Sequence, residues 1–257
     1  SVQYLDVGPR LQNRFRGPAD LERVRAARVE RDLAYVAEGM ELLAGAVHPE
    51  LSVIGFAGAP LTLGAYLVEG GPKNSLRGLK SMFYREPQLA LDLLDGIADA
   101  TADLLTMQIR AGADIVQLFD SWSGYVGPED YEQLAIPALR KLVGRVKEQG
   151  VPVILYVRGA ASHLEIAATT GCDVLSVDSS LTLAEARRRL DPSISLQGNL
   201  EPAELLGPRE RIRRRVHSMI ESVGPERLIV NLGQGLTPDL PIEGIQAFVD
   251  AVREWKA

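Results

Sequence analysis

The stretch VILYVRGAASHLEIAATTGCDVLSV, residues 153–177, contains the pattern that decides the fold. Its two ends, Val153–Val157 and Val174–Val177, are short and almost continuously apolar, which is typical of strands buried on both faces of a parallel sheet. Between them, Ser162–Thr170 predicts a helix that ends at Gly171, because glycine commonly follows the last turn of a helix. A strand, a helix and a second strand in this order indicate an α/β fold.

The same alternation continues in both directions along the chain. Four further apolar runs predict buried strands: Ser52–Ala59, Asp114–Phe119, Ile194–Gln197 and Leu228–Leu232. Helical periodicity or capping signals mark five more segments: Pro87–Arg110, Pro128–Gln149, Thr182–Leu190, Pro208–Val223 and Ile242–Trp255. No linker divides the chain, so we expect one domain that spans residues 1–257.

The strand count falls short of the number that the chain length suggests. A chain of 257 residues has about the usual length of an eight-unit βα barrel, yet six strands are clear. The first part of the chain is mainly helical in pattern (Ala19–Ala46), with a weak strand signal at Val2–Leu5. We therefore expect a (β/α)8 TIM-like barrel whose first two βα units are missing or not visible in this sequence. The alternative is an open doubly wound sheet, but no G-x-G-x-x-G or Walker A pattern follows a strand.

Composition and charge exclude several classes of protein. Apolar residues make up 46% and charged residues 24% of the chain, which excludes a disordered chain, a collagen and a coiled coil. No run reaches the roughly 18 uncharged apolar residues of a membrane span, and the net charge of −6 argues against a nucleic-acid partner. Cys172, the only cysteine, excludes an intramolecular disulfide and a thiolate-rich zinc site. We expect a cytoplasmic protein whose start, Ser-Val-Gln, is processed, trimmed or unobserved.

Ligands of parallel βα folds gather at the carboxyl ends of the strands. In this sequence those ends carry mainly small and polar residues: Gly58–Pro60, Asp120–Gly124, Arg158–Gly159, Asp178–Ser180, Gly198–Leu200 and Gly233–Gly235. Such residues allow close approach of the backbone to a ligand, so they predict a ligand-lined rim. The alternative is that they form ordinary turns, which are rich in the same residues.

The three histidines form no catalytic or metal-binding motif. His48 lies in an expected connection between elements. His217 follows the basic cluster Arg209–Arg215, which predicts a solvated helix face. His163 lies near the start of a predicted helix, where it could face the rim. No H-E-x-x-H pattern and no G-x-S-x-G elbow occurs. Tyr66 follows the first clear strand, where a phenol could bind a carboxylate or could be an ordinary half-buried tyrosine.

Four segments, in order, resemble the signature segments of the uroporphyrinogen decarboxylase family. They are IGFAGAPLTL at 54–63 with YLVEGG at 66–71, QLFDSWSG at 117–124, LQGNLEP at 196–202 and NLGQGLTPD at 231–239. The resemblance covers the chain from about Val2 to the C-terminus. Four collinear segments make it far more specific than any one of them would be.

The resemblance implies a distorted (β/α)8 barrel, usually a cytoplasmic homodimer, and a carboxy-lyase activity. The family removes the four acetate carboxyl groups of uroporphyrinogen III, which gives coproporphyrinogen III and CO2 in haem and other tetrapyrrole synthesis. It uses no metal and no cofactor. By the same resemblance, Tyr66 and Ser121 bind the substrate, and Phe56 lies where backbone groups approach the macrocycle. Gln234 stands where the family usually has histidine, and it can still hydrogen-bond a carboxylate arm although it does not titrate near pH 7.

The chain departs from the family pattern in two further ways. The family's Arg-rich stretch and the aspartate that binds the pyrrole nitrogens precede the matched region, so the catalytic residues of this chain are unknown. We therefore expect the sequence to be a fragment, or the expressed polypeptide to be longer than 257 residues. Asp178-Ser179 also replaces the usual Asp-Trp. Two alternatives stay open. One is a non-catalytic tetrapyrrole-binding relative. The other is a cobalamin- or thiol-dependent methyltransferase of the same superfamily; such enzymes use zinc held by His and Cys, and the single cysteine argues against this alternative.

Overall fold

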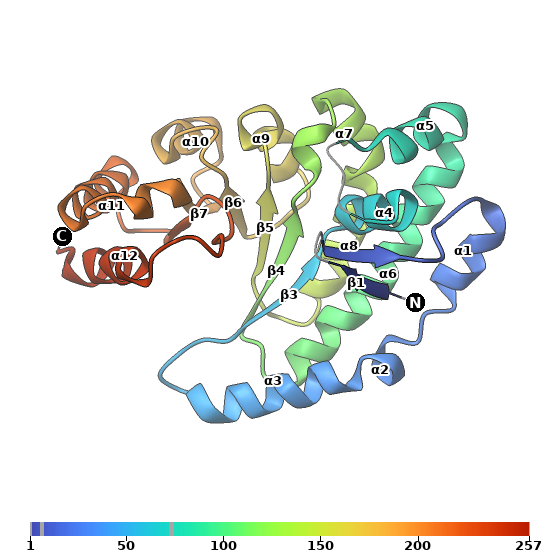
Figure 1. Cartoon of the computed structure of the whole chain (residues 1–257), viewed down its shortest axis with the longest axis horizontal. Coiled ribbons are helices and arrows are strands. Elements are labelled where there is room, and N and C mark those ends of the chain that lie inside the picture. Colours follow the sequence, from blue (N-terminus) through green and yellow to red (C-terminus); the bar gives the residue numbers. More distant parts are fainter. Residues whose placement is uncertain (1, 6–7, 72–74, 257) are drawn as a thin grey trace.

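Six parallel strands form one curved sheet in the computed structural model, which describes residues 2–5, 8–71 and 75–256 (Figure 1). The strands are β3 (Ile54–Gly58), β4 (Ile115–Asp120), β5 (Val153–Val157), β6 (Val174–Val177), β7 (Ser195–Leu200) and β8 (Leu228–Leu232). They are hydrogen-bonded to one another in sequence order, so β3 and β8 form the two edges. All six predicted strands are therefore confirmed.

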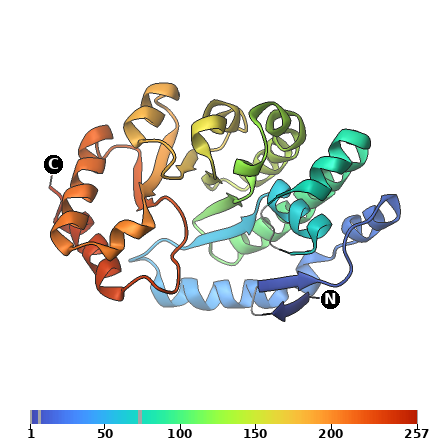
Figure 2. The same cartoon turned by 45° about the horizontal axis from the view of Figure 1, so that its top comes forward.

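Helices follow the sheet in an arc around its outer face (Figure 2). From β3 onward they are α4 (Pro60–Glu69), α5 (Arg77–Arg85), α6 (Pro87–Arg110), α7 (Pro128–Leu134), α8 (Ile136–Lys147), α9 (Ala160–Ala168), α10 (Leu183–Arg189), α11 (Arg209–Val223) and α12 (Ile242–Glu254). Short 3-10 turns, η1 (Ser123–Tyr125) and η2 (Pro202–Leu206), follow β4 and β7. This alternation is that of a βα-barrel wall, which confirms the predicted α/β class and TIM-like arrangement.

Side chains along each strand alternate between two environments, because successive residues of a strand point to opposite faces. In β4, Val116 and Leu118 face the helices and are fully buried in the main apolar core. Gln117 and Phe119 lie on the opposite, concave face, where they line a cavity. The core is therefore on the convex side of the sheet, and the concave side is free to carry polar residues.

The segment before β3 adds no strand to the parallel sheet. β1 (Val2–Leu5) is a strand, as the weak signal indicated, but it pairs antiparallel with β2 (Gly8–Leu11) in a separate two-stranded hairpin. The region predicted as mainly helical contains α1 (Pro18–Arg25), α2 (Val29–Asp32) and α3 (Ala34–Val47). Within the described residues the parallel sheet thus has six strands, in agreement with the six that the sequence indicates.

Two local predictions need correction. The helix predicted over Pro128–Gln149 is two helices, α7 and α8, which meet at Ala135. Pro137 lies in the first turn of α8, and proline has no N–H to continue the hydrogen bonds of a preceding helix. The capping box predicted at the start of α10 is formed in one half only: the Glu185 N–H donates to Thr182 Oγ1 at 3.1 Å, whereas the Glu185 carboxylate pairs with Arg188. No helix within the described ranges is long and apolar enough to cross a membrane.

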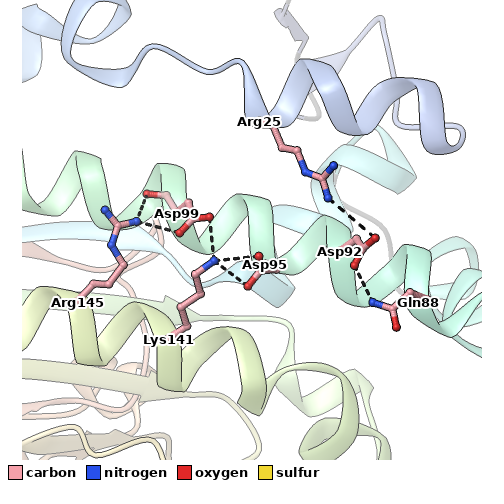
Figure 3. Close-up of polar contacts among 7 residues, drawn as sticks. All are labelled: Arg25, Gln88, Asp92, Asp95, Asp99, Lys141 and Arg145. Carbon is pink, nitrogen blue, oxygen red and sulfur yellow. Dashed lines mark hydrogen bonds and ion pairs between the residues drawn. The ribbon is translucent and has the colours of Figure 1, made fainter.

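A row of ion pairs joins α6 to α8 along their exposed sides (Figure 3). Lys141 Nζ lies 2.8 Å from carboxylate oxygens of Asp95 and Asp99, and Arg145 pairs with Asp99 at 2.9 Å and with Asp103 at 2.8 Å. Asp99 is therefore the shared carboxylate of the row. Because α6 and α8 cover neighbouring parts of the sheet, the row fixes one helix against the other.

The variant Asp99→Asn is expected to lower the unfolding free energy by about 1 kcal/mol, because it removes the carboxylate that two cations share while each keeps one other partner. Denaturant unfolding at low and high salt would measure this loss, which should shrink as salt screens the pairs. Glu30→Gln, which breaks a single exposed pair with Arg110, is the matched control and should change little. A loss that does not depend on salt would contradict the electrostatic explanation.

Candidate functional site

A cavity of about 540 Å³ lies at the carboxyl ends of the strands, on the concave side of the sheet. Its lining comes from β4, β5, β6, β8 and the segments that follow them: Gln117, Phe119, Ser121, Tyr156, Arg158, Ser176, Asn231, Leu232, Gln234, Gly235 and Thr237. We call it the barrel-mouth cavity. Its position agrees with the rim predicted from the sequence, because the carboxyl ends of parallel strands meet at one edge of the sheet.

Two of the predicted substrate-binding residues line this cavity. Ser121 directly follows β4 and is half-buried, whereas Gln234 follows β8 and is exposed. A third, Phe56 on β3, is 63% exposed on the concave side, and its ring meets Phe119 edge to face with centroids 6.2 Å apart. Since Phe119 lines the cavity, the structure brings Ser121, Gln234 and Phe56 to one region from three separate sequence segments.

Tyr66 lies in the wall of a different cavity. That cavity has a volume of about 620 Å³ and is mostly apolar, and it is lined by the segment that contains α1 and α2 together with α4 and α6. The Tyr66 ring meets Trp122 edge to face with centroids 5.8 Å apart, and Trp122 is the residue after Ser121. Tyr66 therefore does not line the barrel-mouth cavity; its ring contacts Trp122, the neighbour in sequence of the lining residue Ser121.

Several polar residues of the predicted rim hold the backbone. Asp178 accepts hydrogen bonds from the Gly159 N–H at 2.7 Å and the Ala160 N–H at 3.3 Å. These groups lie at the start of α9, where backbone N–H groups have no acceptor within the helix. The Asn199 side chain donates to the carbonyls of Asp178 and Leu181 at 2.9 and 2.6 Å. For these residues the turn interpretation of the rim is correct, and the part of the rim that surrounds an open space is the barrel-mouth cavity.

Asp120, at the end of β4, is fully buried on the helix side of the sheet. Its two oxygens accept hydrogen bonds from Thr62 Oγ1 and from the Tyr131 hydroxyl, each at 2.9 Å. Burial raises the pKa of Asp120 to about 6, although Tyr131, Thr62 and the nearby His163 each favour the charged form. Burial also raises the pKa of Tyr131 well above its ordinary value, with Asp120 adding to the effect.

The contacts of Asp120 fix the segment that carries Ser121. Thr62 belongs to α4 and Tyr131 to α7, so one carboxyl group joins two helices to the end of β4. Thr62 Oγ1 in turn accepts a hydrogen bond from the Trp122 N–H at 3.3 Å. Because Asp120 and Trp122 flank Ser121, the position of the Ser121 backbone is set from both sides.

The histidines do not line the barrel-mouth cavity. His163 is buried against Tyr131, with Nδ1 3.0 Å from the Gly159 carbonyl and Nε2 2.9 Å from the Val126 carbonyl, so the interpretation that it faces the rim is wrong. His217 Nε2 lies 3.0 Å from the Ala251 carbonyl, and His48 pairs with Asp114 at the other end of the sheet. The arginines of residues 209–215 are exposed, as predicted.

Sequence reasoning missed the polar floor of the cavity. Tyr156 is buried, donates from its hydroxyl to the Gly233 carbonyl at 3.2 Å, and has a pKa that burial raises to about 12. Below it, Gln197 Nε2 donates to Ser176 Oγ at 2.9 Å and to Gln117 Oε1 at 3.3 Å. Each of these residues stands within a run of the sequence that is mostly apolar. A polar residue inside a predicted buried strand was therefore the signal that could have found them, because it must find a polar partner or a cavity.

A curved sheet of parallel strands, covered by helices and holding a polar cavity at its carboxyl edge, defines an α/β protein of the βα-barrel class, in which enzymes bind their substrates at this edge. The family model described as uroporphyrinogen decarboxylase (URO-D) matches residues 1–255. The chain belongs to the uroporphyrinogen decarboxylase family.

Individual relatives agree with the family match. The uroporphyrinogen decarboxylase of Myxococcus xanthus is 40% identical over 252 residues, which cover 98% of this chain and 72% of the relative. That of Hahella chejuensis is 37% identical over 255 residues, which cover 97% of this chain and 72% of the relative. The chain thus spans about seven-tenths of the length of these curated relatives.

Solved structures of other proteins share the fold. A methyltransferase from Methanosarcina mazei superposes with a TM-score of 0.84 at 20% identity, covering 99% of this chain and 75% of that one. A B12-independent methionine synthase from a Shewanella species superposes with a TM-score of 0.61 at 14% identity, covering 85% of this chain and 66% of that one. At such low identity these structures support the barrel-like fold alone.

Proposed function

We propose that the protein removes the four acetate carboxyl groups of uroporphyrinogen III, giving coproporphyrinogen III and CO2. The observation that carries the proposal is that Ser121 and Gln234, from two separate family segments, line one cavity at the carboxyl edge of the sheet. Membership of the family and the names of its curated members support the same substrate. We further propose that residues 1–257 form one domain of a cytoplasmic homodimer, as the family resemblance implies.

The reaction sets chemical demands that the cavity can meet in part. Direct loss of CO2 from an acetate arm would leave an unstable carbanion. Protonation of a pyrrole carbon first makes the ring a cationic electron sink, so the electrons of the breaking C–C bond move into the ring as CO2 leaves. A second proton then completes the methyl group, and the ring carbon releases the first proton, which restores the aromatic pyrrole. Because the substrate supplies its own electron sink, we propose that no cofactor or metal is needed.

Each proposed binding residue has a distinct part in this scheme. The Ser121 hydroxyl and the Gln234 amide can donate hydrogen bonds to carboxylate arms. Phe56 and Phe119 offer an apolar surface on which the flat faces of pyrrole rings can pack. We propose that Tyr66 binds the substrate on its α4 side, next to Trp122. These residues bind and orient the macrocycle, and the catalytic acid and the cation-stabilising group remain unassigned.

The zinc-dependent methyltransferase alternative has little support from the residues themselves. Cys172 is buried, and burial raises the pKa of its thiol to about 11, which disfavours the thiolate that zinc binds. In the part of the chain that the structure describes, no group of three or more His, Cys, Asp or Glu side chains is arranged to hold a metal ion. A non-catalytic tetrapyrrole-binding relative is favoured by Gln234 in place of the family's usual histidine, and turnover decides between it and the decarboxylase.

The full-length protein is expected to convert uroporphyrinogen III to coproporphyrinogen III, with Ser121→Ala and Tyr66→Phe each reducing kcat/KM about tenfold, the effect of losing one hydrogen bond to a charged group. Chromatography of the oxidised products, which separates porphyrins by carboxyl number, measures the conversion. Ser52→Ala and Tyr35→Phe, which alter exposed residues outside both cavities, are the matched controls. A full-length protein that binds the substrate without releasing CO2 would overturn the decarboxylase proposal in favour of the non-catalytic relative.

A further inference from the structure

Arg158 is the one charged side chain that lines the barrel-mouth cavity within the described residues. It directly follows β5 (Val153–Val157), so it lies at the carboxyl edge of the sheet beside the ends of β4 and β6. The other lining residues are neutral and include the donors Ser121, Gln234 and Thr237. A single cation among neutral hydrogen-bond donors is a suitable environment for an anionic group of a ligand.

The backbone of Arg158 is held firmly in place. Its N–H donates to the Asp120 carbonyl at 3.3 Å, and its carbonyl accepts a hydrogen bond from Ser123 Oγ at 2.7 Å. Ser123 is fully buried, and its one hydroxyl proton is shared between this carbonyl and that of Asp120, which also lies 2.7 Å from Ser123 Oγ. The chain at Arg158 is therefore fixed to the end of β4, next to Ser121, and only the side chain is free to turn.

The guanidinium group itself has no carboxylate partner among the described residues. The Arg158 Cζ lies 5.9 Å from the centroid of the Tyr125 ring, which leaves the N–H groups at the edge of the guanidinium available. Two acids of the rim have other partners: Asp178 accepts from the start of α9, and Glu201 accepts from the Ser179 hydroxyl. By contrast, Arg189 is paired with Glu165.

We propose that Arg158 binds a carboxylate arm of the macrocycle at the barrel-mouth cavity, with Ser121 and Gln234 as neighbouring donors. The inference rests on the proposed function and deepens it, because it assigns a charged anchor to a substrate that carries eight carboxylates. Arginine presents its N–H groups in a planar fork that matches both oxygens of a carboxylate, so the anchor also fixes orientation. Arg158 is a binding residue in this scheme and takes no part in bond breaking.

The test uses uroporphyrin, the oxidised and unreactive octacarboxylate, as a fluorescent probe with the full-length protein. Arg158→Met should weaken uroporphyrin binding and raise KM for uroporphyrinogen about tenfold, while kcat changes little. Arg158→Lys, which keeps the charge but loses the planar fork, should give an intermediate Kd. The salt dependence of binding should be shallower for Arg158→Met than for the wild type.

Two controls separate the possible failures. Arg214→Met removes an exposed arginine of α11, outside the cavity lining, and should leave Kd and KM unchanged. Thermal unfolding checks that each variant is folded. A wild type that binds uroporphyrin and decarboxylates uroporphyrinogen, with an Arg158→Met variant that does both equally well, overturns the Arg158 inference alone. A wild type that neither binds nor decarboxylates overturns the proposed function and this inference with it.

Discussion

Gly233→Ala is expected to lower the unfolding free energy by about 1–3 kcal/mol, the usual cost of forcing an extra carbon into a packed site. A Cβ at this position would lie 2.8 Å from the Ser179 backbone nitrogen and 3.2 Å from the Asn199 carbonyl oxygen. Both are main-chain atoms, which cannot turn away as the end of a flexible side chain can. The added carbon must therefore push the end of β8 away from the neighbouring strand ends.

The same displacement should reduce activity by a factor on the order of ten to a hundred, since small misplacements of binding groups are costly. Gly233 is held on both sides: its N–H donates to the Leu200 carbonyl at 2.8 Å, and its carbonyl accepts from the Tyr156 hydroxyl. Moving it breaks these contacts and shifts the adjacent Gln234 within the cavity lining. Denaturant unfolding and product chromatography measure the two effects.

Gly235→Ala supplies a matched control within the same segment. No heavy atom lies within 4 Å of a Cβ at Gly235, and its backbone is not in the left-handed region, so the substitution should leave the unfolding free energy close to that of the wild type. Gly235 itself lines the cavity, so this control applies to stability and not to activity. If Gly233→Ala is as stable as Gly235→Ala, the close approach of the strand ends at Gly233 does not limit stability. A loss of stability confined to Gly233→Ala is explained by that close approach.

The strands were predictable because burial on both faces leaves a plain trace in the sequence. Val153–Val157 is buried at all five positions, and its predicted and observed bounds coincide. The run predicted at Ser52–Ala59 was too long by two residues at the start and one at the end, because apolar composition continues beyond the hydrogen-bonded strand at Ile54–Gly58. Continuous apolar runs thus locate parallel strands well and fix their ends less well.

Helices α4 and α5 were not predicted, because contacts with distant parts of the chain, rather than local sequence patterns, determine where they form. The glycines and Pro60 after β3 favour a turn, yet α4 forms there and buries Leu61 and Ala65 against the core. The start of α5 depends on Glu69, whose Oε1 accepts the Gly78 N–H at 2.6 Å and the Leu79 N–H at 3.2 Å. A cap supplied from nine residues earlier in the chain leaves no local pattern to read.

The site was predictable as far as topology alone brings residues together. Ser121 and Gln234 are 113 positions apart, but each follows a strand, so the parallel sheet places both at one edge. Tyr66 follows its strand by two turns of α4, and the position of that helix depends on side-chain contacts. For the same reason the sequence could mark Asp120 as part of a motif without indicating that it is buried on the helix side of the sheet.

Asp120→Asn is expected to remove a pH-dependent contribution of about 3 kcal/mol to the unfolding free energy. The folded protein raises the pKa of Asp120 to about 6 from the ordinary value of 3.8, so folding favours the protonated carboxyl. A difference of about two units corresponds to about 3 kcal/mol of unfolding free energy. The contribution of Asp120 is therefore most favourable below pH 4, declines as the pH rises through about 6, and is constant above pH 7.

Asparagine occupies nearly the same volume and has no titrating proton. The one amide oxygen can accept a hydrogen bond from the hydroxyl of Thr62 or from that of Tyr131. The free-energy cost of rearranging the other hydroxyl does not depend on pH. The difference in unfolding free energy, variant minus wild type, should therefore rise by about 3 kcal/mol between pH 4 and pH 7. Denaturant unfolding at closely spaced pH values measures it, and the offset at pH 4 reports the cost of the rearranged hydrogen bonds separately.

Asp191→Asn provides the control of opposite sign. Ser193 donates hydrogen bonds to the Asp191 carboxylate and lowers its pKa, so its contribution is present above pH 4 and is lost only below that. The difference in unfolding free energy between Asp191→Asn and the wild type should thus stay level between pH 4 and pH 7, while the corresponding difference for Asp120→Asn rises. An Asp120 difference that also stays level would mean that the carboxylate keeps enough solvation to ionise normally, and that α4 and α7 are joined to β4 less tightly than the geometry indicates.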